Sequence, residues 1–212
     1  MMGKQLKKGV LIAFEGIDGA GKTTQAILVR NWLTDKGYDV IVFKEPTKGS
    51  WGQKIREIVN YGRHGISPRD ELELFVNDRK ENVEQNIRPA LEARKLVLMD
   101  RYYFSTIAYQ GARGIDPDDI RQINEKFAPT PDLVLLLDLS PGLGLSRILN
   151  GRDGKLNQFE KEEYLKEVRA IFKRLELPYI QTVDGARSQD DVFNDIRNIL
   201  SDVVKPFELP TE

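Results

Sequence analysis

Short apolar runs alternate with longer amphipathic stretches along the chain. Five runs, each four or five residues long, are rich in aliphatic and β-branched side chains: 10–14, 40–43, 96–99, 133–137 and 179–183. Nearly continuous hydrophobicity over so few residues is typical of strands that are buried on both faces of a parallel sheet. Because helix-length segments separate the runs, the chain is expected to form βαβ units. We predict an α/β fold with a parallel five-stranded sheet flanked by helices.

Two of the amphipathic stretches predict helices with definite ends. The first begins at Lys22 and ends near Lys36, and Gly37 after it suits a C-terminal cap. The last covers residues 189–204, repeats apolar side chains on one face and has Ser188 as a candidate N-cap. Only a short loop separates the first helix from the first apolar run, so the two are expected to form a βα unit.

Length and composition exclude several classes of protein. The chain has 212 residues, enough for one α/β domain, and shows no interdomain linker, so we expect a single domain over residues 1–212. Its 32 Lys and Arg against 33 Asp and Glu give a net charge of −1, which provides no general attraction to nucleic acid or anionic membranes. The absence of cysteine excludes disulfides and thiolate zinc sites. Because no apolar run is long enough to cross a bilayer or to form a signal-peptide core, we expect a cytoplasmic protein with no nucleic-acid or membrane partner.

A phosphate-binding loop follows the first predicted strand and opens the first predicted helix. It satisfies the pattern G-x-x-x-x-G-K-[ST] at every fixed position, with the residues Gly16, Ile17, Asp18, Gly19, Ala20, Gly21, Lys22 and Thr23. Small residues let the backbone curl around a phosphate, and the helix N-terminus adds a positive dipole end. Lys22 would bind the β- and γ-phosphates, and the Thr23 hydroxyl suits Mg²⁺. The alternative is a glycine-rich turn with a chance lysine, but strand, loop and helix occur in the required order. We predict that this loop and Thr24 bind ATP together with Mg²⁺.

A second phosphate site is predicted at Asp100 and Arg101, directly after the third apolar run. Ligands of open α/β sheets collect at the carboxyl ends of the strands, which places these side chains near the phosphate-binding loop. A carboxylate there can hold Mg²⁺ or orient the attacking oxygen, and an arginine can bind a second phosphate through two hydrogen bonds. The alternative is a strand-end aspartate in a turn beside a solvated arginine. We assign Lys22, Asp100 and Arg101 to catalysis, and Thr23 and Asp100 to the metal.

Four segments of the chain resemble the thymidylate kinase family. The first is F-E-G-I-D-G-A-G-K-T-T-Q at 14–25. The second, D-R-Y-Y-F-S-T-I-A-Y-Q-G at 100–111, is similar to the family segment D-R-[YH]-x-x-S-x-x-A-[YF]-Q-G. The segments L-F-V-N-D-R at 74–79 and K-E-P at 44–46 are similar to the family's L-F-x-A-x-R helix and R-E-P turn. The resemblance extends from about residue 9 to residue 200 and implies a P-loop NTPase-type fold with a mobile lid.

The resemblance implies transfer of the γ-phosphoryl group of ATP to thymidine monophosphate (dTMP), which gives dTDP and ADP in dTTP biosynthesis. Phe75 would stack on the thymine ring, and Arg79, one helical turn later, would reach a base carbonyl. Plain core packing is the alternative role of Phe75, because Leu72, Leu74 and Val76 lie beside it in the sequence. Only the family match favours stacking.

The resemblance also assigns the sugar, the phosphate and the base edge to particular residues. Asp18 would contact the 3′-hydroxyl, Tyr109 would lie under the deoxyribose, and Arg101 would hold the acceptor phosphate. Arg56 would assist with that phosphate or, equally, be an exposed helix arginine. Ser105, Thr106 and Gln110 would line the base pocket, and Glu45 and Pro46 are the remaining implied substrate-binding residues. A buried site that hydrogen-bonds its ligand rejects analogues that lack the matching groups.

A lid is implied at about residues 146–163. Arg147 would pack on adenine, and residues 184–186 would wrap the adenine edge. One family subgroup carries a catalytic arginine in the phosphate-binding loop, where such a charge stabilises the transition state. The corresponding position here is Gly19, so we expect the arginine to come from the lid, as in the other subgroup, with Arg152 as the candidate.

Two departures from the family pattern leave other functions open. Gln158 stands where lid-arginine members have a second arginine, and Lys44 replaces the arginine before Glu45. Lysine cannot reproduce the two-pronged hydrogen bonding of arginine. The alternatives are a kinase for another nucleoside monophosphate or for a deoxynucleoside, and a nucleotide-binding module with little turnover. The resemblance favours a thymidylate kinase and also implies a homodimer.

Overall fold

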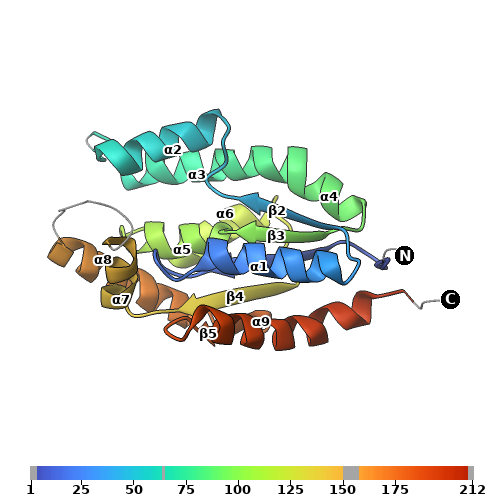
Figure 1. Ribbon diagram of the computed structural model, residues 1–212. Helices are drawn as coiled ribbons and strands as arrows, with labels where there is room; N and C mark the ends of the chain where they lie inside the picture. The colour runs from blue at the N-terminus through green and yellow to red at the C-terminus, as the bar shows by residue number, and fades with distance from the viewer. Residues whose placement is uncertain (1–3, 64, 150–157, 210–212) are drawn as a thin grey trace.

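A parallel sheet of five strands forms the centre of the molecule (Figure 1). The computed structural model describes residues 4–63, 65–149 and 158–209. The strands are β1 (Val10–Glu15), β2 (Val40–Lys44), β3 (Leu96–Asp100), β4 (Leu133–Asp138) and β5 (Ile180–Asp184). Their order in the sheet is β2-β3-β1-β4-β5, and every neighbouring pair is parallel. The predicted α/β fold with a parallel five-stranded sheet is confirmed.

Burial differs between the central strands and the edge strands. All residues of β1 and β3 are buried, and β4 is buried except at Asp138. In β2 the apolar side chains are only half-buried, and in β5 Gln181 and Thr182 are exposed. The expectation of burial on both faces is therefore wrong for β2 and β5. An edge strand has a neighbour on one side only, and the covering helices leave part of it open to solvent.

Helices α1 (Lys22–Asp35) and α9 (Gln189–Val204) contact each other and cover one face of the sheet. Both have the predicted ends. Gly37 follows α1 with a φ angle of 88°, and Ser188 caps α9 by accepting a hydrogen bond from the Asp191 N–H. Both helices bury an apolar stripe, which in α1 includes Val29 and Leu33. Local sequence thus determines where these two helices begin and end.

The other helices fill the three remaining connections between strands. Between β2 and β3 lie α2 (Ser50–Tyr61), α3 (Pro68–Asn82), a π-helical turn η1 (Val83–Ile87) and α4 (Arg88–Glu92). Between β3 and β4 lie α5 (Tyr103–Gly111) and α6 (Pro117–Glu125). Between β4 and β5 lie α7 (Pro141–Leu149) and α8 (Gln158–Arg174), and a 3-10 turn η2 (Lys205–Phe207) follows α9. Figure 1 shows α1 in front of the sheet and α6 behind it. Over the described ranges, no helix combines the length and apolar character needed to span a membrane.

The register of the strands brings their polar carboxyl ends to one edge of the sheet. Asp100 at the end of β3 is paired with Phe14 of β1 and with Lys44 of β2. Asp138 of β4 is paired in the same way with Asp184 of β5. The phosphate-binding loop follows β1 directly and therefore leaves the sheet at this edge. The strand-end side chains thus lie around that loop.

Candidate active site

The loop between β1 and α1 adopts positive φ angles at three glycines. Gly16, Gly19 and Gly21 have φ angles of 138°, 82° and 91°, a region that residues with a Cβ atom rarely adopt. Since α1 begins at Lys22, its first N–H groups, which have no partner within the helix, lie at the end of the loop. The Lys22 ammonium donates to the carbonyl oxygens of Gly16 at 3.0 Å and Ile17 at 2.8 Å. The Lys22 ammonium is therefore held inside the loop that is predicted to bind phosphate.

Lys22 is buried beside a second cation. Burial and the nearby Arg101 guanidinium lower its pKa, and Asp18, Asp100 and Glu15 oppose this only in part. A buried ammonium is stabilised by an opposite charge close to it. The site therefore favours an anionic ligand such as the phosphate chain of a nucleotide.

The tip of the loop lies against helix α7. A Cβ atom on Gly19 would lie 2.3 Å from the Gly144 carbonyl oxygen, and one on Gly144 would lie 2.6 Å from the Asp18 carbonyl oxygen. Neither position can accept a side chain unless the backbone moves. The structure thus leaves no room for an arginine at position 19, which agrees with the expectation of an arginine from elsewhere. Arg152, the candidate, lies outside the described residues, as does most of the central part of the expected lid.

Thr23 and Asp100 supply oxygen atoms of the kind that Mg²⁺ prefers. Thr23 Oγ1 donates to Asp100 Oδ2 at 2.5 Å, and Asp100 Oδ1 is buried without a hydrogen-bond partner among the described residues. Lys44 Nζ lies 2.8 Å from Asp100 Oδ2 and 3.1 Å from Thr23 Oγ1. Within the described chain no cluster of three or more His, Cys, Asp or Glu side chains could hold a metal alone. Mg²⁺ fits this pair of ligands if nucleotide oxygens and water complete its coordination.

Arg101 contacts Asp18 and Tyr109, which are predicted to bind the sugar, and Ser105, which is predicted to line the base pocket. Its backbone has a φ angle of 70°, and its N–H donates to the Phe14 carbonyl oxygen at 3.1 Å. Its guanidinium donates to Asp18 Oδ1 at 2.5 Å and to Ser105 Oγ at 2.8 Å. The guanidinium carbon lies 5.2 Å from the centre of the Tyr109 ring, and the Tyr109 hydroxyl donates to Asp18 Oδ2 at 3.1 Å. The structure therefore brings these predicted residues together beside the phosphate-binding loop.

Arg79 is held in a buried hydrogen-bonded network. Its Nε donates to Glu45 Oε2 at 2.8 Å, its Nη1 to Asn124 Oδ1 at 2.6 Å and its Nη2 to Thr106 Oγ1 at 3.0 Å. Asn82 donates to the second Glu45 oxygen at 3.1 Å. Burial raises the pKa of Glu45, while Arg79 and Asn82 act in the opposite direction. Glu45 and Thr106, predicted to bind substrate, thus orient Arg79. Sequence reasoning missed Asn82 and Asn124, which belong to none of the motifs.

The surroundings of Arg56 and Phe75 bear on their alternative roles. Arg56 Nη1 donates to the carbonyl oxygens of Thr47 at 2.5 Å and Pro46 at 3.3 Å, so it is not a solvated helix arginine. Its guanidinium hydrogen-bonds to the turn that contains the cis Glu45–Pro46 peptide.

Phe75 is half-buried and lies outside the hydrophobic core cluster of the described residues. Core packing therefore does not account for Phe75.

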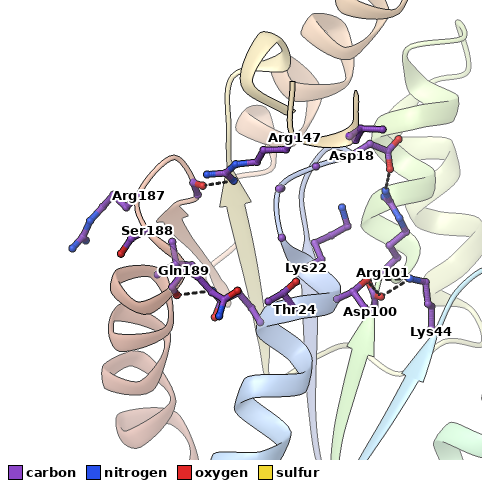
Figure 2. A pocket seen from close by; sticks show the side chains of 18 residues that line it. Asp18, Lys22, Thr24, Lys44, Asp100, Arg101, Arg147, Arg187, Ser188 and Gln189 are labelled. Atoms are coloured by element: carbon purple, nitrogen blue, oxygen red, sulfur yellow. Dashed lines mark hydrogen bonds and ion pairs between the residues drawn. The ribbon is translucent and has the colours of Figure 1, made fainter. Parts of the chain in front are cut away.

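A cavity of about 650 Å³ lies over the phosphate-binding loop (Figure 2), a volume that suits a nucleotide. Figure 2 shows Lys22, Asp100 and Arg101 around the same space. The predicted residues that line it are Asp18, Gly19, Ala20, Gly21, Lys22, Thr23, Thr24, Asp100, Arg101 and Arg147. The residues predicted to lie around the base, including Phe75, Arg79 and the buried Gln110, do not line this cavity.

The side of the cavity that is predicted to contact adenine combines α7 with the turn after β5. Arg147 Nη1 donates to the Gly185 carbonyl oxygen at 2.8 Å, and its Nη2 lies 3.4 Å from the Ala186 carbonyl oxygen. The two segments predicted to contact adenine therefore meet. Seven further lining residues were not assigned to the site from the sequence: Gln25, Lys44, Ile148, Arg187, Ser188, Gln189 and Val192. Three of them, Gln25, Ile148 and Arg187, directly follow predicted residues, whereas the others reach the cavity through the tertiary fold.

Proteins of similar sequence indicate the family of this chain. The sequence model of the family described as thymidylate kinase matches residues 14–196. A thymidylate kinase of Desulfotalea psychrophila is 50% identical over 188 residues, which cover 89% of this chain and 92% of that protein. A probable thymidylate kinase of Archaeoglobus fulgidus is 46% identical over 191 residues, or 90% and 94% of the two chains. A thymidylate kinase of Akkermansia muciniphila is 43% identical over 195 residues, or 92% and 93%. These matches confirm the predicted class of ATP-dependent nucleoside monophosphate kinase, and the chain belongs to the thymidylate kinase family.

Proposed function

We propose that this protein transfers the γ-phosphoryl group of ATP to dTMP in the presence of Mg²⁺ and forms ADP and dTDP. One observation carries the proposal: a single cavity contains the phosphate-binding loop and, at the neighbouring strand end, Asp100 and Arg101. We assign the two cationic groups, Lys22 and Arg101, to two different phosphates, one on each substrate, because they come from different elements. Phosphoryl transfer depends mainly on such positioning and on charge stabilisation.

On the donor side, the loop amides and the N-terminus of α1 would bind the phosphate chain of ATP. Lys22 would exchange its two carbonyl acceptors, Gly16 and Ile17, for phosphate oxygens. This exchange returns a negative charge to a buried ammonium and therefore favours its protonated form. Arg147, already fixed against Gly185, would present its side chain to adenine.

On the acceptor side, Arg101 would hold the phosphate of dTMP. Its guanidinium contacts Asp18 at 2.5 Å, and Asp18 is half exposed, so this partner can be exchanged for a phosphate oxygen. Asp18 would then accept a hydrogen bond from the 3′-hydroxyl of the sugar. Tyr109, whose ring lies beside both residues, would exclude a 2′-hydroxyl.

The metal site proposed here consists of Thr23 and Asp100. Asp100 Oδ1, which has no hydrogen-bond partner in the described part of the chain, and the Thr23 hydroxyl would bind Mg²⁺. The ammonium of Lys44 would leave the position it holds between them. When bound, Mg²⁺ would neutralise the charge that develops on the phosphate oxygens. Asp100 would also lie close enough to orient the attacking phosphate oxygen.

A substrate panel tests the proposal. Turnover with Mg-ATP is measured for dTMP, dUMP, UMP, CMP, GMP and thymidine, and ADP formation is followed. We expect dTMP to have the highest kcat/KM, because Tyr109 disfavours a 2′-hydroxyl and Phe75 provides an aromatic face for the base. A preference for UMP, CMP, GMP or thymidine would contradict the assignment. Tight ATP binding without turnover on any acceptor would favour a nucleotide-binding module.

A homodimer in the cytoplasm completes the proposal. The support is the family resemblance, together with the exposed apolar side chains of Val59 and Tyr61 at the end of α2, which a partner would cover. Light scattering coupled to size exclusion measures the mass in solution. A mass of one chain at micromolar concentration would contradict the dimer and would leave the kinase assignment intact.

A further inference from the structure

Glu15, the last residue of β1, is a buried carboxylate that the proposed chemistry does not use. Its side chain has no solvent exposure. Oε1 accepts hydrogen bonds from the backbone N–H groups of Tyr102 at 2.7 Å and Ser105 at 3.2 Å. Tyr102 is the N-cap residue of α5 and provides no side-chain cap of its own. Glu15 therefore caps α5 from a neighbouring strand.

The second oxygen of Glu15 leads to Arg101. Ser105 Oγ donates its proton to Glu15 Oε2 at 2.5 Å. Because a hydroxyl has one proton, the lone pairs of Ser105 Oγ remain for Arg101, whose Nη1 donates to it at 2.8 Å. By accepting the Ser105 proton, the carboxylate of Glu15 orients the Ser105 hydroxyl so that it can accept the hydrogen bond from Arg101. It fixes one side of the Arg101 guanidinium while Asp18 contacts the other amino group.

A helix cap alone does not require a buried charge. An Asn, Ser or Asp at the N-cap position satisfies the same N–H groups at the surface. Burial of a carboxylate is costly unless it is compensated, and burial raises the pKa of Glu15 to about 7. Three hydrogen bonds and the charge of Arg101 compensate this cost only in part, because the pKa stays raised. The free-energy cost of burying the Glu15 carboxylate is explained if its negative charge has a second role besides capping α5.

We infer that Glu15 is a positioning residue that holds Arg101, through the Ser105 hydroxyl, in the orientation that binds the acceptor phosphate. This inference rests on the proposed function, because that function assigns the acceptor phosphate to Arg101. Glu15 lies immediately before the phosphate-binding loop, which would bind ATP, but Glu15 itself would act on the binding of dTMP. The end of β1 would thus contribute to both substrates: the loop after it would bind ATP, and the Glu15 side chain would help to bind dTMP.

The test compares a nucleotide with its nucleoside in E15Q. Binding of dTMP, thymidine and ATP is measured by calorimetry or competition, with E92Q as the matched control on the exposed surface of α4. We expect dTMP affinity to fall about tenfold in E15Q, because a charge-assisted hydrogen bond is misdirected. Thymidine and ATP should bind within about twofold of the wild type, because neither uses the acceptor-phosphate site. Equal losses for dTMP and thymidine, or no loss for dTMP, would overturn the inference.

A second variant keeps the test independent of the folding of E15Q. S105A removes the intermediate hydroxyl and leaves the carboxylate as the cap of α5. It should also weaken dTMP more than thymidine, and in the double variant the loss should not exceed the larger single loss. Additive losses would show that the two residues act separately and would overturn the inference. If the substrate panel identifies another nucleotide, the same comparison is made with that nucleotide and its nucleoside, so the thymine assignment and the role of Glu15 fail separately.

Discussion

Lys22 and Arg101 are two cations that lie within one cavity, yet each is held by protein acceptors from its own surroundings. Lys22 donates to carbonyl oxygens of the loop, and Arg101 donates to Asp18 and Ser105. Sequence motifs predicted these residues and Asp100, because each motif is attached to the end of a buried strand. The motifs did not predict the place of Lys44 between Thr23 and Asp100, because that contact depends on the pairing of β2 with β3.

Replacement of Lys22 by Met tests the donor side. The change removes the charge and keeps a side chain of similar length, so the fold should persist. We expect kcat to fall about 10²–10³-fold, the usual effect of removing one charged or polar group that stabilises a transition state. A coupled assay for ADP measures the effect, and Lys126→Met, on an exposed residue after α6, is the control. A rate within about threefold of the wild type would exclude Lys22 from the reaction.

Replacement of Glu15 by Gln also changes how stability depends on pH. Burial raises the pKa of Glu15 from 4.5 to about 7, so the folded protein holds this proton more tightly than the unfolded chain does. The stabilisation from this group is therefore complete below pH 4.5 and is lost as the pH rises through about 7. The free energy of unfolding of the wild type relative to E15Q should decrease from about pH 5 to pH 8. Urea titrations across this interval measure it, and a constant difference would contradict the raised pKa.

At the scale of elements, hydrophobic runs and caps were enough to locate the strands and the first and last helices. The π-helical turn Val83–Ile87 and the close contact of the loop with α7 were not predictable from the sequence. Both depend on how distant segments pack, and neither leaves a local pattern of apolar positions. The sequence contains Gly19 and Gly144, but it gives no sign that their backbones are in contact.

Replacement of Gly144 by Ala tests the contact between the phosphate-binding loop and α7. The new Cβ would lie 2.6 Å from the Asp18 carbonyl oxygen, so the loop or the helix must shift. We expect a loss of about 1–3 kcal/mol in the free energy of unfolding, together with weaker ATP binding.

The matched control is Gly142→Ala in the same helix. Of the residues that the structure describes, its Cβ would meet only Glu162, with Oε1 at 3.9 Å. This variant should be unchanged or more stable by about 0.5–1 kcal/mol, because alanine favours a helix. Equal effects of the two substitutions in urea denaturation would show that the Gly144 contact is not restrictive.

At the scale of the whole molecule, we expect two nucleotides to lie at one edge of the sheet with their phosphates facing each other. The sequence indicated this arrangement because parallel strands place their carboxyl ends at the same edge. It could not indicate the buried network of Glu45, Arg79 and Asn124, which joins three separate elements. That network depends on tertiary contacts of α3 with the turn after β2 and with α6.

Replacement of Arg152 by Ala tests the source of the catalytic arginine. Because the Gly144 backbone leaves no room for a side chain at Gly19, the charge that stabilises the transferred phosphoryl group must come from elsewhere. We expect kcat to fall by about 10³-fold or more, with little change in dTMP affinity. Arg174→Ala, on an exposed residue at the end of α8, serves as the control. An unchanged turnover number would assign this role to another group.

The decisive experiment is a crystal structure with dTMP and a non-hydrolysable ATP analogue bound together. We predict that the β- and γ-phosphates lie within the loop of residues 16–23 and that the dTMP phosphate accepts hydrogen bonds from Arg101. A complex in which Arg101 keeps Asp18 as its partner, while the dTMP phosphate lies away from its guanidinium, would contradict the account.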